Sequence, residues 1–219
     1  AEEEKKMITA IRNIGLAALL LAGTVAEAAK GVLKPFVMGN TPAGDMTKVV
    51  EATKAALTAN GFEVVGGYSP YAGATVIVAT NADLKAAAAK ARNGGFGLGQ
   101  RVAVTEHKGK VQVSYMNPAY MGAAYGLGDL QAVSDKLKAA LGASQTFGAE
   151  GLTAEELAPG NYHYMIGMPY FHQIDSHGDF ASHEEAVATI EKSLAAGKMG
   201  TVKVYRIDMP GKQVVVFGV

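Results

Sequence analysis

Arg101-Val-Ala-Val-Thr105 and Val111-Gln-Val-Ser-Tyr115 alternate apolar and polar side chains with a period of two. This period is typical of strands that bury one face, because successive side chains point to opposite faces of a sheet. Between the two segments lies Lys108-Gly109-Lys110, and glycine is favoured in tight hairpin turns. The sequence therefore predicts an antiparallel β-hairpin here.

Two further hairpins are predicted on either side of this one. Residues 62–68 and 75–79 are rich in β-forming side chains and flank a Ser-Pro-Tyr-Ala-Gly turn. The end of the chain repeats this arrangement, with residues 202–207 and 214–219 on the two sides of Pro210-Gly211. Three hairpins indicate a sheet that is mainly antiparallel.

Apolar residues recur at three- and four-residue spacing between the hairpins, which is the pattern of amphipathic helices. Thr41 is the expected N-cap of the first helix, ahead of Pro42. Gly142 is placed to end the predicted helix 130–141 at its C-terminus. The predicted helices are 42–59, 81–91, 117–125, 130–141, a brief helix at the capping box Thr153 to Glu156, and a longer helix at the capping box Ser182 to Glu185.

Residues 162–168 form an apolar run that we predict to be a strand. With it, the order strand, helix, hairpin occurs twice, near 35–80 and near 162–219. Segregated hairpins and helices favour an α+β fold, an antiparallel sheet with helices on one face built from two such units. The expected organisation is a signal peptide at 1–28, a first α+β unit at 29–147, and a smaller β-α-β-β unit at 148–219 that packs with the first as one globular body.

The composition excludes several classes of protein. The chain has 219 residues, of which 49% are hydrophobic and 18% charged, with 20 basic residues, 20 acidic residues and no cysteine. A chain without net charge has no general attraction for nucleic acid, so we expect no nucleic-acid partner. Without cysteine there are no disulfides, thiolate zinc sites, thiol nucleophiles, iron-sulfur clusters or covalently attached haem.

The N-terminal segment has the pattern of a secretory signal peptide. Lys5, Lys6 and Arg12 precede the uncharged apolar run 14–26, which ends at the small-x-small tripeptide Ala26-Glu27-Ala28. A membrane anchor is the alternative, but the run is shorter than the roughly 18 to 20 apolar residues of a spanning helix. We therefore expect a periplasmic or secreted protein that has no stable membrane insertion once the leader is removed.

One segment of the chain resembles a known family. Gly99-Gln-Arg-Val-Ala-Val-Thr-Glu-His-Lys-Gly-Lys-Val-Gln-Val-Ser-Tyr-Met-Asn-Pro-Ala-Tyr-Met121 and the close at 182–219, with Lys203-Val-Tyr-Arg-Ile-Asp208, look like exported bacterial proteins of the "domain of unknown function 302" family. The resemblance covers about residues 35–219. It implies a TATA-binding-protein-like arrangement of helices on a curved antiparallel sheet, and often a homodimer. It implies no activity and no catalytic residues.

The glycine-rich run Gly94-Gly95-Phe-Gly97-Leu-Gly99 invites a comparison with nucleotide-binding loops. A dinucleotide-binding loop follows a strand and opens a helix, whereas this run follows a helix and opens a strand. We therefore predict a flexible connector. The sequence also has no Walker A motif, no H-E-x-x-H and no G-x-S-x-G.

Histidine and methionine gather in one segment, and both can bind metals. Four of the five histidines, His163, His172, His177 and His183, lie within this segment, together with Met165, Met168, Asp175 and Asp179. Histidine with methionine would suit copper, histidine with aspartate would suit zinc, and a non-covalent haem is a further alternative. The metal candidates are His163, His172, His177, Met165 and Met168. The alternative is that these are solvated loop histidines, because no established ligand spacing is present.

Aromatic residues form two groups that could face each other across a ligand pocket: one has Tyr115, Tyr120 and Tyr125, and the other has Tyr162, Tyr164, Tyr170 and Phe171. A tyrosine side chain suits such a lining, because its ring is apolar and its hydroxyl is polar. The alternative is that these residues form part of the core or a dimer interface. The pocket candidates are Tyr115, Tyr120, Tyr125 and Tyr164.

The sequence thus favours an exported soluble binding or accessory domain whose ligand it does not identify. One alternative is a periplasmic copper, zinc or haem protein that uses the His/Met-rich segment 163–183. Another is a small hydrolase or isomerase with a histidine base near Tyr120 or Tyr164. No catalytic residue is predicted, the sequence favours binding over catalysis, and we expect a homo-oligomer.

Overall fold

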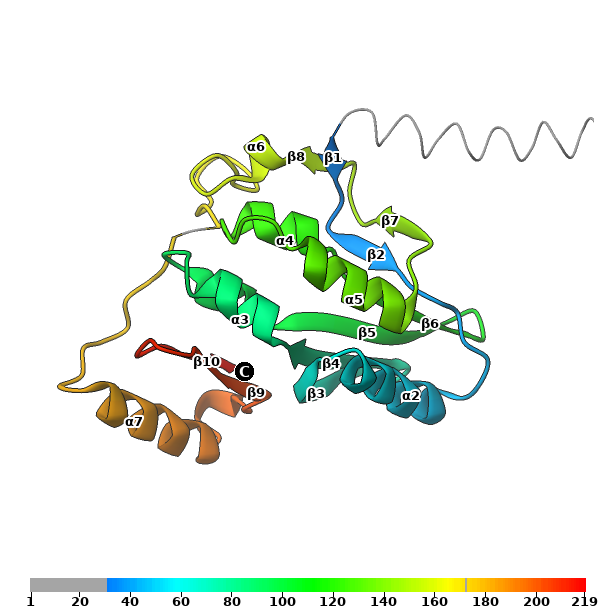
Figure 1. Ribbon diagram of the computed structural model, residues 1–219. Coiled ribbons are helices and arrows are strands. Elements are labelled where there is room, and N and C mark those ends of the chain that lie inside the picture. Colours follow the sequence, from blue (N-terminus) through cyan, green and yellow to red (C-terminus); the bar gives the residue numbers. More distant parts are fainter. Residues whose placement is uncertain (1–30, 172) are drawn as a thin grey trace, which may run out of the picture.

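The computed structural model describes residues 31–171 and 173–219, so the predicted signal peptide and His172 lie outside the described residues. The fold is α+β, as predicted, and is built on a six-stranded antiparallel sheet (Figure 1). In spatial order the strands are β3 (Glu63–Tyr71), β4 (Ala74–Thr80), β5 (Gln100–His107), β6 (Lys110–Met116), β2 (Phe36–Met38) and β7 (Gln145–Phe147).

Helices cover one face of this sheet, as Figure 1 shows for α2, α3, α4 and α5. Helix α2 contacts β3, β4, β5 and α5, so it joins the sheet to the helical layer. The described helices are α2 (Met46–Ala59), α3 (Ala82–Ala88), α4 (Pro118–Ala124), α5 (Gln131–Leu141), α6 (Ala154–Leu157) and α7 (His183–Ala195), with short 3-10 helices η1 (Gly94–Gly97) and η2 (Lys198–Gly200).

The central hairpin has the buried face that its period of two predicts. Val102, Val104 and Val113 are buried, while the residues between them are at least partly exposed. Register pairs such as Val104 with Val113 stack these side chains across the two strands. The apolar stripes of α2 and α5 close the core over them. Their fully or nearly buried residues are Val49, Thr53, Leu57, Val133, Leu137 and Leu141.

Thr53 is the one polar residue within the buried stripe of α2. Its hydroxyl donates to the carbonyl oxygen of Val49 at 2.7 Å, so the buried oxygen has a partner inside the helix. The N-terminus of the same helix differs from the prediction. Asp45, not Thr41, is the N-cap, and its carboxylate accepts from the amide of Lys48 at 2.9 Å. That hydrogen bond lowers the pKa of Asp45.

The segment after the sheet is tied back to the start of the described chain. Strand β8 (Leu152–Thr153) pairs with β1 (Val32–Leu33), and α6 packs on α4. The predicted capping box of Thr153 and Glu156 is present at the start of α6. Asn117 links the same region, because its side chain accepts from Ala119 at the start of α4 and donates to the carbonyl oxygen of Lys34 at 2.8 Å.

The C-terminal part consists of α7 and the predicted hairpin, β9 (Tyr205–Asp208) and β10 (Val215–Gly218). Strand β9 lies alongside β3, the edge of the large sheet (Figure 1). Glycine permits this approach, since a Cβ at Gly66 would lie 2.1 Å from the carbonyl oxygen of Val204.

The predicted strand at 162–168 is wrong. This segment is a turn, in which a single bridge joins His163 to Tyr170. Gly167 adopts φ +88°, a left-handed conformation that reverses the chain before Pro169 and prevents an extended run. The second strand-helix-hairpin unit therefore lacks its first strand.

Within the described residues, no helix has the length and apolar character needed to cross a membrane.

Candidate functional site

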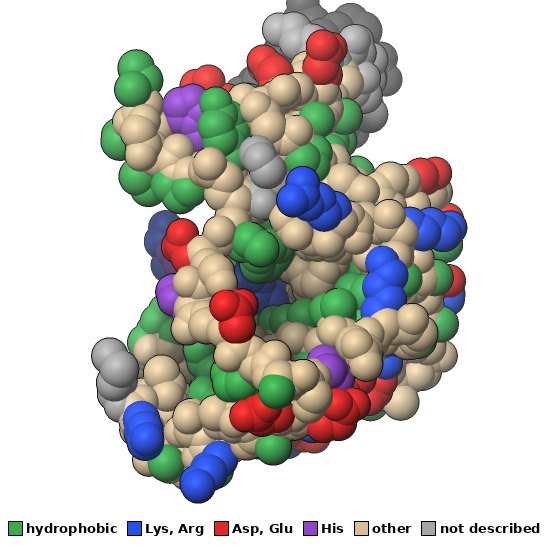
Figure 2. Space-filling model, turned by 90° about the vertical axis from the view of Figure 1, so that its left-hand side faces the viewer, with side chains coloured by type: hydrophobic (Ala, Val, Ile, Leu, Met, Phe, Trp, Pro, Cys, Tyr) green, Lys and Arg blue, Asp and Glu red, His purple; other side chains and the backbone are tan. Residues whose placement is uncertain are grey.

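A cavity of about 710 Å³ lies where the C-terminal end of α3 meets the end of α4; we call it the first cavity. One of its lining residues, Ile174, belongs to residues 173–181, which we call the crossing segment and which lead from the turn at 163–170 to α7. Figure 2 shows this side of the molecule, where the surface is hollowed between two parts of the protein. The residues lining the first cavity are Lys90, Ala91, Arg92, Asn93, Tyr125, Gly126, Pro159 and Ile174.

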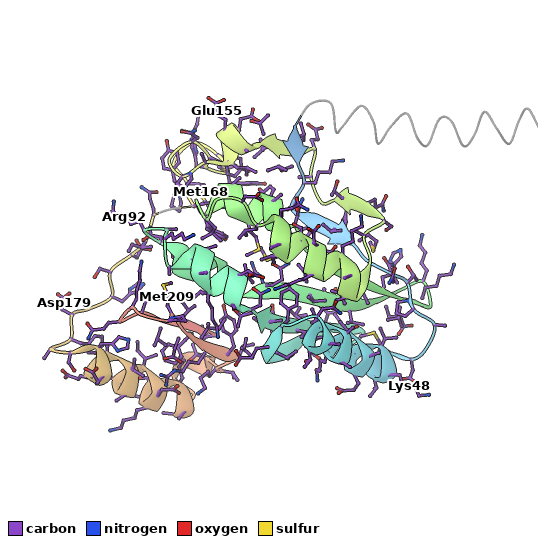
Figure 3. The ribbon with its side chains drawn as sticks, viewed as in Figure 1. Lys48, Arg92, Glu155, Met168, Asp179 and Met209 are labelled. Atoms are coloured by element: carbon purple, nitrogen blue, oxygen red, sulfur yellow. The ribbon has the colours of Figure 1, made fainter. Side chains whose placement is uncertain are left out.

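A second cavity of about 440 Å³ lies between residues 91–96, which follow α3, and the C-terminal hairpin. Ala91, Arg92, Asn93 and Ile174 line both cavities, so the two adjoin. Figure 3 shows Arg92 at the end of α3 and Met209 below it, beside the hairpin. The other residues lining the second cavity are Gly94, Gly95, Phe96, Met209, Lys212, Val214, Val215, Val216 and Phe217.

The glycine-rich run follows the wall shared by the cavities and, as predicted, connects a helix, α3, to a strand, β5. Residues Gly94–Gly97 form the 3-10 helix η1, and the amide of Phe96 donates to the carbonyl oxygen of Asn93. A Cβ at Gly94 would lie 2.0 Å from the carbonyl oxygen of Ala88. The glycine therefore lets the chain fold back tightly onto α3, which places Arg92 and Phe96 at the two cavities.

Aromatic rings from three parts of the chain meet beside the first cavity. Tyr125 lies 6.1 Å from Phe96 and 6.2 Å from Phe171, measured between ring centroids. Tyr162 lies 5.2 Å from Phe171. Burial raises the pKa of Tyr120, and the neighbouring phenols of Tyr162 and Tyr125 raise it further. The two aromatic groups in the sequence therefore face each other through these residues.

Two of the predicted pocket tyrosines lie elsewhere. Tyr164 is 76% exposed, on the turn at 163–170. Tyr115 is buried in β6, and its hydroxyl donates to the carbonyl oxygen of Gly142 at 3.0 Å. Of the four predicted pocket tyrosines, Tyr125 lines the first cavity, and Tyr120 lies near Tyr125.

Replacing Tyr115 by phenylalanine tests its structural role. Burial raises its pKa from 10.0 to about 12, so the neutral phenol is favoured in the folded state. The stabilisation is complete below the unfolded pKa and is lost as pH rises through the folded pKa. We expect Tyr115→Phe to lower the free energy of unfolding by about 1 kcal/mol at neutral pH, and to weaken the loss of stability between pH 10 and about 12. Urea unfolding at neutral and alkaline pH measures both; an unchanged pH dependence would contradict the assignment.

The predicted metal ligands are only partly brought together. His163 and Met168 line one open pocket of about 560 Å³ in the turn, although a strand would have pointed them to opposite faces. The Nδ1 atom of His163 lies 2.6 Å from the carbonyl oxygen of Met165, and its ring packs edge-on against Tyr170 at 4.9 Å. The side chains of Met165 and Met168 are exposed.

The other described histidines, His177 and His183, lie on different elements. His177 is exposed on the crossing segment, and His183 is half-buried in the first turn of α7. In the described part of the chain, no three histidine, aspartate or glutamate side chains are arranged to hold a metal ion. The described residues also put no histidine in the lining of either cavity.

The sequence did not single out the residues that dominate the cavities: Lys90, Arg92, Phe96, Ile174 and Val216. They come from a helix end, a glycine-rich turn, the crossing segment and the last strand. The glycine-rich run was the available signal, because closely spaced glycines also mark a backbone that packs against other backbone.

Comparison with known proteins identifies the central part of the chain. Residues 70–144 match the family model described as domain of unknown function DUF302. No curated protein matches the chain significantly. The match contains the quoted segment 99–121 and the wall at 90–96, whereas the C-terminal close at 182–219 lies outside it. Residues 70–144 of the chain thus match the DUF302 family, the family that the sequence resembles.

Proposed function

We propose that this protein is a binding module that holds a small organic molecule in the two adjoining cavities beside the crossing segment. The observation that carries the proposal is the lining itself. Exposed apolar side chains line a concave space, together with the polar side chains of Arg92 and Asn93, which line both cavities. Phe96 is 50% exposed and Ile174 is 63% exposed. Concave, mostly apolar sites with a few polar groups are typical of small-molecule binding.

The volumes support the same function. The cavities measure about 710 and 440 Å³, within the roughly 300 to 1,000 Å³ usual for ligand pockets. The aromatic rings of Tyr125 and Phe171 provide flat apolar surface beside them. The pocket residues therefore supply shape and apolar contact.

Ile174 gives a direct test, because it lines both cavities. We expect the protein to bind the uncharged fluorescent probe N-phenyl-1-naphthylamine, and Ile174→Gln to weaken that binding about tenfold through lost apolar contact and a buried amide. Fluorescence titration measures the dissociation constant. Ile166→Gln is the matched control, since Ile166 is 96% exposed and lines neither cavity. Equal effects of the two variants, or no binding of the probe, would rule out the proposed site.

We further propose that the protein is exported, on the strength of the basic, apolar and small-x-small sequence of the N-terminal segment. The mature mass of the protein purified from its own host tests this, with cleavage expected near Ala28. A product that retains residues 1–28 would contradict it. Self-association stays a prediction, which light scattering of the mature protein measures.

A further inference from the structure

We infer that the ligand of the two cavities is an amphiphilic anion, a molecule with one negatively charged head group and a single apolar body. The inference rests on the proposed binding function and specifies its ligand class. It comes from the charges of the lining and from the way polar and apolar side chains are divided between the two cavities.

The charged side chains of both linings have one sign. Lys90 and Arg92 line the first cavity, and Arg92 and Lys212 line the second. Neither lining contains a described aspartate or glutamate. Asp175 and Asp179 of the crossing segment are exposed and belong to neither lining. The chain as a whole carries equal numbers of acidic and basic residues, so this local excess of positive charge is not a result of composition.

The cavity cations also differ from many basic residues in the rest of the fold. Lys90, Arg92 and Lys212 have no ion-pair partner among residues 31–171 and 173–219. An anionic head group at the rim would pair with Lys90 and Arg92, and a carboxylate or phosphate can accept two hydrogen bonds from one guanidinium. In the described part of the chain, basic residues with carboxylate partners include Lys48, Lys54, Lys85, Lys136, Lys203 and Arg206.

The second cavity provides the part of the site that would hold the apolar body of the ligand. Apart from Lys212, its lining away from Arg92 consists mainly of Phe96, Met209 and the side chains of residues 214–217. Phe96 and Val214 are exposed to it, although large apolar side chains gain by leaving water. An alkyl or aryl body placed there would cover them.

The two cavities adjoin in a way that lets one molecule occupy both. Residues 91–93 and Ile174 form their common wall, with Arg92 between the charged rim and the apolar lining. Figure 3 shows Arg92 above and Met209 below along this path. A head group at Lys90 and Arg92 would therefore direct an attached apolar chain toward Met209 and the hairpin.

Competition for the bound probe tests this inference. N-phenyl-1-naphthylamine is displaced with decanoate, decyl phosphate and 1-decanol, which share the same alkyl chain. We expect one or both anions to displace the probe at a concentration about tenfold lower than the alcohol, as charge-assisted hydrogen bonds to the head group require. The comparison of decanoate with decyl phosphate then distinguishes a carboxylate head from a phosphate head.

Charge-neutralising variants connect the preference to these residues. In the double variant Lys90→Gln, Arg92→Gln the preference for the anions over 1-decanol should disappear, with each displacement measured against the probe affinity of that same variant. The control Lys138→Gln, Lys192→Gln removes the same charge from exposed positions on α5 and α7, and should keep the preference. Probe binding without any preference for the anions, or a preference that survives in the first variant, would overturn the inference alone. Absence of probe binding would overturn the proposed function and the inference with it.

Discussion

Leu137→Ala is expected to lower the free energy of unfolding by about 2 to 5 kcal/mol, the range for truncating a fully buried leucine. Leu137 is 0% exposed on α5 and belongs to the core between the helices and the sheet. Its loss leaves a cavity in the core beside α5, a helix that packs against α2, α3 and α4. Small proteins are stable by only about 5 to 15 kcal/mol, so this change would be large. Urea denaturation followed by circular dichroism measures it.

Lys138→Ala is the control, since Lys138 is exposed and follows Leu137 in the same helix. We expect it to change the free energy of unfolding by no more than about 0.5 kcal/mol. Similar effects of the two substitutions would show that α5 does not pack on the sheet through Leu137.

Gly94→Ala is expected to destabilise the protein by about 3 kcal/mol and to abolish probe binding. Glycine to alanine usually stabilises by about 0.4 to 1 kcal/mol where the backbone conformation suits both residues. Gly94 is not among the glycines with positive φ, so the backbone conformation does not oppose alanine here. The added Cβ would instead lie 2.0 Å from the carbonyl oxygen of Ala88, which forces the backbone of η1 away from α3.

Gly95→Ala is the matched control for this substitution. A Cβ at Gly95 would meet only a methyl group of Val216 at 3.0 Å, and a side chain yields more readily than backbone. We expect a smaller loss of stability and retained probe binding. Thermal melting and probe titration of both variants decide the point, and a Gly94→Ala protein as stable as the parent would contradict the close packing of η1.

Local patterns predicted most of the fold. The hairpins around residues 108–110 and 210–211 follow from alternation and turn residues, and the capped helices follow from apolar spacing and the side chains that begin them. The errors arose where two local choices compete. Asp45 and Thr41 can both cap a helix, and only Asp45 lies next to the first residue of α2. Residues 162–168 have strand-forming side chains, but the turn at Gly167 prevents pairing along their length.

The candidate site was less accessible, because it depends on contacts between residues distant in sequence. Tyr125 and Phe171 meet across 46 positions, and the tyrosine pattern predicted that the two aromatic groups could face each other. Arg92 gave no such signal, since an isolated basic residue after a helix is ordinary. Its significance comes from Ile174 and Val216, which the tertiary fold brings into the lining of cavities that Arg92 also lines.

Amide chemical-shift mapping during titration with N-phenyl-1-naphthylamine tests the central claim most directly. If the cavities beside the crossing segment bind the small molecule, the largest changes will fall on residues 90–96, Tyr125, Ile174 and 214–217. Changes confined to the turn at 163–170, or spread over the surface without saturation, would contradict the account.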